Sequence, residues 1–111
     1  MQTLKQYADG CLTVRLRGEL DHSAAAEAMR AIEEAAEEYL PRQCVLDLSG
    51  LSFMDSSGIA VILKADRLLR QSGASLSLSQ PPEQVRRVLE IAGLSQMVPI
   101  QARKEKECEP I

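Results

Sequence analysis

The residues best placed to do chemistry in this 111-residue chain form the motif Asp55-Ser56-Ser57-Gly58. A mostly apolar stretch precedes the motif and an apolar pattern with helical spacing follows it, so the motif falls at the start of a helix. The first turn of a helix has unpaired backbone N–H groups and the positive end of the helix dipole. Such a turn can bind an anion, including a phosphate attached to the protein itself.

Two interpretations of the serines are open at this point. Serine and aspartate cap helices routinely, and loss of such a cap typically costs about 1 kcal/mol. Gly58 favours a role beyond capping, because a glycine in the first turn weakens a helix by about 1 kcal/mol relative to alanine. Something close to this backbone would explain a glycine there. The residues alone do not decide between a structural cap and a modification site.

The elements that must position this motif alternate along the chain. Apolar patterns and turn residues predict strands over residues 3–7, 11–17, 44–48, 74–79 and 97–100, and helices over residues 24–40, 56–71 and 82–92. Loops are expected over residues 18–23, ending in the capping residues Asp21 and Ser23, and between Gly50 and Asp55. This order predicts an α/β domain with a mixed, mostly parallel sheet of four to five strands and three to four helices, β-β-α-β-α-β-α-β. The first hairpin adds an antiparallel edge.

Composition limits the classes of function. One domain over residues 1–102 is expected, followed by a charged, frayed tail over residues 103–111. The net charge of −3 and the three aromatic residues argue against direct nucleic-acid binding. The chain has no apolar run near the roughly 20 residues of a membrane helix and no signal-peptide pattern, so we expect a cytoplasmic protein without a membrane partner. The cysteines at 11, 44 and 108 are odd in number and lack a Cys-x-x-Cys pair, which favours reduced thiols over a disulfide framework or a zinc site.

An enzyme is disfavoured by the same residues. A serine nucleophile needs a base, and the only histidine is His22, in the loop before the first helix. The motif lacks the Gly-x-Ser-x-Gly spacing of a nucleophile elbow, and the chain has no Walker motif. A metal site from Asp21, His22 and Asp55 is conceivable, but no spacing favours it. We therefore expect no catalytic residue, metal or cofactor.

A strip along the predicted second helix suggests a binding surface. Ile59, Leu63, Asp66 and Arg70 follow one another at helical steps in line with Ser56. Apolar residues interleaved with opposite charges suit a polar, reversible protein interface. The alternative is that Ile59 and Leu63 form the edge of the core.

Three segments carry a resemblance to a known family: Gly18-Glu-Leu-Asp-His22, Leu51-Ser-Phe-Met-Asp-Ser-Ser-Gly58 and Val85-Arg-Arg-Val-Leu-Glu-Ile-Ala-Gly-Leu94. Together and in this order they resemble a STAS domain. Within that family they are most similar to the bacterial anti-sigma factor antagonists (anti-anti-sigma factors) of the sporulation type. The similarity covers about residues 3–100.

The resemblance implies partner switching in the control of transcription. The unphosphorylated protein would bind an anti-sigma factor with serine kinase activity and release a sigma factor. Phosphorylation of Ser56, the serine directly after the aspartate, would end binding until a serine phosphatase restores it. The implied partner-binding residues are Asp21, His22, Ser23, Asp55, Ser56, Ser57, Gly58, Ile59 and Leu63. The alternative is a STAS scaffold in a stressosome-like or lipid-transport complex without sigma-factor control.

Overall fold

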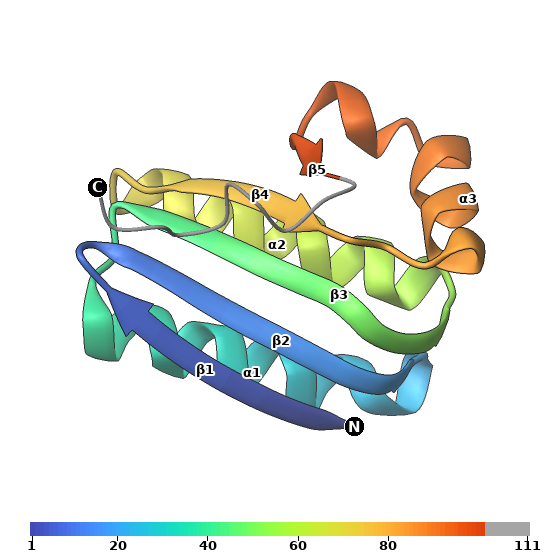
Figure 1. Cartoon of the computed structure of the whole chain (residues 1–111), viewed down its shortest axis with the longest axis horizontal. Helices are drawn as coiled ribbons and strands as arrows, with labels where there is room; N and C mark the ends of the chain where they lie inside the picture. The colour runs from blue at the N-terminus through green and yellow to red at the C-terminus, as the bar shows by residue number, and fades with distance from the viewer. Residues whose placement is uncertain (102–111) are drawn as a thin grey trace.

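The computed structural model describes residues 1–101 as a five-stranded sheet with helices packed on it (Figure 1). The predicted tail over residues 103–111 lies outside the described residues. The elements are β1 (Gln2–Ala8), β2 (Cys11–Leu20), α1 (His22–Tyr39), β3 (Gln43–Met54), α2 (Ser56–Gln71), β4 (Ser75–Ser79), α3 (Glu83–Ile91), a 3-10 turn (Leu94–Gln96) and β5 (Ile100–Gln101).

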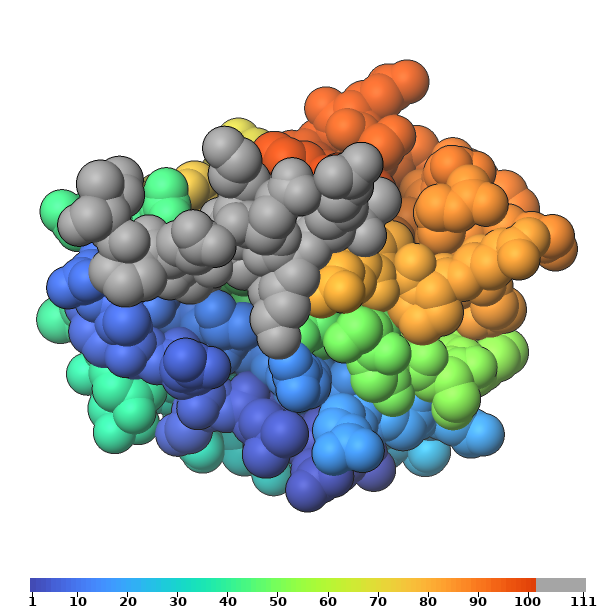
Figure 2. Space-filling model, viewed as in Figure 1, coloured from blue at the N-terminus to red at the C-terminus, as the bar shows by residue number. Residues whose placement is uncertain are grey.

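The sheet has the simple strand order β1-β2-β3-β4-β5. β1 pairs antiparallel with β2, and each later pair is parallel. The predicted fold class is therefore confirmed, including the antiparallel edge made by the first hairpin. In the space-filling view (Figure 2) the blue atoms of β1 and the orange and red atoms of α3 and β5 lie at opposite sides of the molecule, as this strand order requires.

The core lies between the sheet and its helices. α1 and α2 lie side by side behind the sheet in Figure 1, and α3 packs against β3 and α2. Alternate residues of β2 point into the core, because successive side chains of a strand face opposite sides. The largest fully buried side chains are Leu12, Leu16, Leu20, Ile32, Leu46, Leu48, Met54, Ile62, Leu69, Leu78, Leu89 and Leu94. No helix within residues 1–101 is long and apolar enough to cross a membrane.

Two predicted loops are wrong, because the strands continue through the glycines that were expected to end them. β2 runs on to Leu20 through Gly18, and β3 runs on to Met54 through Gly50. Gly50 pairs with Arg17 where the register of the two strands shifts. A Cβ on Gly50 would lie 2.6 Å from the Arg17 Cγ atom, so the glycine permits a close approach within the sheet.

The prediction of reduced thiols is confirmed for Cys44 and wrong for Cys11. Cys44 is free and buried, and burial raises the pKa of its thiol to about 12. Cys11 is disulfide-bonded. Spacing along the sequence could not show this, because a disulfide depends on the distance between side chains in the folded chain.

Candidate functional site at the start of two helices

Asp55 caps the N-terminus of α2 in the way the sequence predicts. Its backbone is extended, and its Oδ1 atom accepts a 2.8 Å hydrogen bond from the Ser57 N–H. The Asp55 carbonyl oxygen accepts a 3.0 Å bond from the Gly58 N–H. Ser56 is the first residue of the helix and is exposed, whereas Ser57 is half-buried. No acceptor for the Ser56 N–H lies within the described part of the chain, so one backbone donor remains for an anion at this turn.

Asp21 caps α1 in a similar manner, three residues before the predicted start of that helix. α1 begins at His22, because Asp21 already has the extended backbone of a cap and its Oδ1 atom accepts a 3.1 Å bond from the Ala24 N–H. The Ser23 hydroxyl donates a 2.9 Å bond to the same carboxylate. This Ser23 bond, followed by the Ala24 N–H, holds the pKa of Asp21 below its ordinary value. Asp21 is therefore an anion at neutral pH.

The sheet register brings the two caps together. Leu20 and Met54, the last residues of β2 and β3, are paired in the parallel ladder, and the Asp55 N–H donates a 3.4 Å bond to the Leu20 carbonyl. Asp21 and Asp55 directly follow this pair, so they lie about one strand spacing apart, roughly 4.8 Å. In Figure 1 the N-termini of α1 and α2 lie at the right, where β2 and β3 end. The sequence-predicted residues 21–23 and 55–58 thus form one cluster.

Gly58 has a structural reason to be glycine. It is buried, and a Cβ added to it would lie 2.5 Å from the Met54 Cγ atom, 3.0 Å from the Met54 Sδ atom and 3.1 Å from the Leu20 Cδ2 atom. The close approach that the sequence suggested at this position is therefore an internal one. It seats the first turn of α2 on the ends of β2 and β3.

Gln84 on α3 holds the site from the other side and was missed by the sequence analysis. Its Oε1 atom accepts a 3.0 Å bond from the Met54 N–H, and its Nε2 atom donates a 3.0 Å bond to the Met54 carbonyl. The amide side chain thus pairs with the end of β3 as a neighbouring strand would. No local pattern could reveal this pairing, because the two residues are 30 positions apart.

The strip along α2 is less exposed to solvent than the sequence pattern predicted. Ile59 and Leu63 are half-buried and pack against the core, as the alternative interpretation expects. Asp66 is 8 % exposed and is ion-paired with Arg70 at 3.0 Å. Only the exposed parts of Ile59 and Leu63 extend the surface away from Ser56.

A groove of about 530 Å³ between α1 and α2 begins at the same cluster. Its lining includes His22 and Ser57. Within residues 1–101, no hydrogen bond joins His22 to Ser56 or Ser57. In the same part of the chain, no three His, Cys, Asp or Glu residues are grouped to hold a metal ion.

The fold is that of a known domain family. Residues 3–107 match the model of the STAS domain family, and the chain belongs to that family. A relative called anti-sigma F factor antagonist, from Paenibacillus polymyxa, is 36 % identical over 100 residues, which cover 90 % of this chain and 86 % of the relative.

Two solved structures show the same fold in a protein that exists in two states. The unphosphorylated form of the anti-sigma factor antagonist SpoIIAA is 28 % identical, with a TM-score of 0.79 over 95 % of this chain and 91 % of that one. The phosphorylated form of the Bacillus cell fate determinant SpoIIAA is 27 % identical, with a TM-score of 0.71 over 95 % of each chain.

Proposed function

We propose that this chain is a cytoplasmic anti-sigma factor antagonist that is phosphorylated on Ser56. In this proposal the unphosphorylated form binds an anti-sigma factor, which is also a serine kinase, and thereby frees a sigma factor. Phosphorylation releases the antagonist, and a serine phosphatase restores it. The observation that carries the proposal is an exposed Ser56 at the first turn of α2, beside two capping aspartates. The names of the relatives support the same role.

The turn can accept a phosphate without unfolding. A phosphoserine adds about −1.5 to −2 charges at pH 7. At a helix N-terminus a negative charge is typically stabilising by about 0.3–1 kcal/mol. Ser56 is exposed, so the group need not enter the core, and the unpaired Ser56 N–H lies next to it. The internal cost of modification is therefore small.

The same charge is costly across an interface. Asp21 and Asp55 already place two carboxylates at this edge, so the phosphate would make a cluster of three anions. A partner that accommodates the unmodified surface would face added bulk and like-charge crowding. A loss of about 3–4 kcal/mol weakens binding several-hundred-fold, which suffices for a switch.

The proposed docking surface combines both helix starts with the exposed side of α2. Ser56 and Ser57 lie at its centre, Asp21, His22 and Ser23 on α1 flank them, and Ile59 and Leu63 extend it along α2. Asp55 acts mainly as the cap, because its Oδ1 atom is bonded to the Ser57 N–H. Gly58 is buried and contributes by letting the turn sit close to Met54.

The test uses the anti-sigma F factor of Paenibacillus polymyxa, with that organism's own antagonist as the positive control. The wild-type chain should bind this protein, gain one phosphate with ATP, and show it on Ser56 by mass spectrometry. Ser56→Ala should bind and take up no phosphate, whereas the matched Ser57→Ala should still be phosphorylated. Phosphate on Ser57, or no binding while the positive control binds, would contradict the proposal. A STAS scaffold would show neither phosphate uptake nor dependence on ATP.

A further inference from the structure

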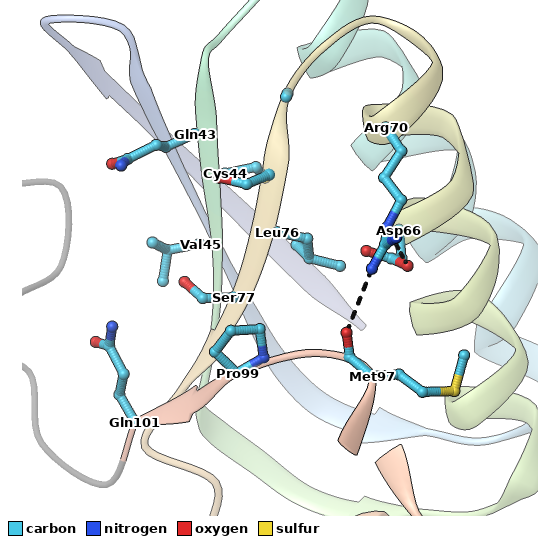
Figure 3. Close-up of a pocket in the computed structure, with 12 residues that line it drawn as sticks. Gln43, Cys44, Val45, Asp66, Arg70, Leu76, Ser77, Met97, Pro99 and Gln101 are labelled. Atoms are coloured by element: carbon cyan, nitrogen blue, oxygen red, sulfur yellow. Dashed lines mark hydrogen bonds and ion pairs between the residues drawn. The ribbon is translucent and has the colours of Figure 1, made fainter. Parts of the chain in front are cut away.

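A second site lies at the opposite edge of the sheet from β1, along β4. β5 pairs only with Leu78 and Ser79, so on the side away from β3 the first part of β4 has no neighbouring strand within residues 1–101. A groove of about 450 Å³ occupies this position (Figure 3). It is bounded by α2 on one side and by the segment from Met97 to Gln101 below, and its lining includes Leu76 and Ser77.

The groove presents an unpaired backbone donor and acceptor. The Ser75 N–H bonds to the Arg42 carbonyl and so points toward β3, whereas the Leu78 N–H bonds to the Pro99 carbonyl and points toward β5. Because the N–H and C=O of successive strand residues alternate between the two sides, the Leu76 N–H and C=O face the groove. No bond to either group is present within residues 1–101. Unpaired backbone groups of a residue that is 4 % exposed are rare and costly.

The ladder stops here for two chemical reasons. Continuing the parallel register would require residue 99 to donate to the Leu76 carbonyl, but Pro99 has no N–H. The carbonyl that would accept the Leu76 N–H belongs to Met97, and it is instead 3.4 Å from the Arg70 Nη2 atom. The dashed lines of Figure 3 show Arg70 joined to both Asp66 and Met97. Within residues 1–101, the segment after α3 therefore does not complete this edge.

A third unpaired group lies in the same groove. The Oε1 atom of Gln101 is buried and has no hydrogen-bond partner in the described part of the chain. In addition, β4 reads Ser-Leu-Ser-Leu-Ser and has no charge or proline, the usual devices that keep other strands away from an edge. A donor, an acceptor and a free amide oxygen together match the main chain and one amide side chain of an extended peptide.

We propose that the free edge of β4 is a binding site for an extended peptide segment of a partner protein, which adds a short strand beside Leu76. We expect the added strand to run antiparallel to β4, so that the residue opposite Leu76 exchanges two main-chain hydrogen bonds with it and directs an apolar side chain toward α2. Its neighbours would point to the other face, where an Asn or Gln can donate to the Gln101 Oε1 atom. A second copy of this chain fits less well, because its own β5 would have to enter the same narrow space.

In the test, the ¹⁵N-labelled full chain is titrated with the peptide Ac-Gln-Ile-Gln-NH2, which is short enough not to reach the Leu78–Ile100 pair, and the amide resonances are followed by NMR. The Leu76 amide should shift in a saturable manner. Methylating the nitrogen of the central isoleucine removes the donor to the Leu76 carbonyl and should weaken binding about fivefold or more. Gln101→Ala should also weaken binding, whereas Gln96→Ala, an exposed glutamine outside this groove, should not.

Three results would overturn the proposal. The first is a Leu76 amide that does not move at millimolar peptide, and the second is equal affinity for the parent and methylated peptides. The third is sedimentation of the protein as a dimer with the Leu76 N–H protected from exchange, because the occupant would then be a second copy. None of these results depends on Ser56 or on an anti-sigma factor, so the test stands apart from the proposed function.

Discussion

Replacing Gly58 by alanine tests whether the first turn of α2 is held by close packing. Helix propensity alone predicts a gain of about 1 kcal/mol from this change. The structure predicts a loss, because the new Cβ would lie 2.5 Å from the Met54 Cγ atom and 3.1 Å from the Leu20 Cδ2 atom, and both side chains are fully buried. Overpacking a core typically costs about 1–3 kcal/mol. We expect a net loss of about 1 kcal/mol, or a melting temperature lower by about 4–8 °C.

Two companion variants separate packing from propensity. Ala60→Gly, at an exposed position of the same helix, measures propensity alone and should cost about 1 kcal/mol. Met54→Ala removes the nearest atoms, so in that background Gly58→Ala should become neutral or stabilising. Urea unfolding of the four combinations at positions 54 and 58 gives the coupling energy. A stabilising Gly58→Ala in the wild-type background, or additive effects with Met54→Ala, would refute the packing argument.

Three further outcomes follow from the site and the sheet. Gln84→Leu should lower the free energy of unfolding by about 1–3 kcal/mol and speed hydrogen exchange of the Met54 amide, because both hydrogen bonds to the Met54 backbone are lost. Unchanged exchange at Met54 would contradict this role. Ser56→Asp should leave the melting temperature within a few degrees of wild type in calorimetry, and unfolding would refute the claim that the turn tolerates an anion. Burial alone would raise the pKa of Asp47, but hydrogen bonds from Ser49 and the ion pair with Arg15 at 2.9 Å outweigh burial. The net effect is a pKa below the ordinary carboxyl value. Its contribution to stability is thus present above the ordinary carboxyl pKa and lost as pH falls through the lowered value, so Asp47→Asn should flatten the stability curve below about pH 4.

The sequence was most informative where local chemistry decides the structure. Capping by Asp21 and Asp55 was among the interpretations that the sequence offered, and α2 runs over the expected residues from Ser56 to Gln71. Capping requires one side chain and one backbone N–H two or three positions away, so its signal lies within a single turn. The alternation of strands and helices along the chain also followed from local patterns, and it predicted a mostly parallel sheet, since strands joined by a helix usually run parallel.

The sequence was least informative where residues far apart decide the structure. Gly18 and Gly50 resembled strand ends, but both lie where the register of β2 and β3 shifts, and Gly50 permits a close approach to Arg17. Gln84 resembled an ordinary exposed helix residue until its pairing with Met54 was seen. Asp66, expected on a docking strip, is nearly buried beside Arg70. Each depends on a contact that no local pattern contains.

The separation of the two rims of the sheet has a practical use. The two capping aspartates directly follow β2 and β3 at one end of the sheet, and the short turn Ser72-Gly73 lies exposed at the other end, about 24 Å away along α2 at the usual rise of a helix. A cysteine placed at Ser72 would therefore accept a fluorophore, or tether the protein to a sensor chip, with the two helix N-termini turned toward the bulk solvent. Immobilised in this orientation, the molecule would present the proposed docking surface to any partner solution while association is recorded continuously.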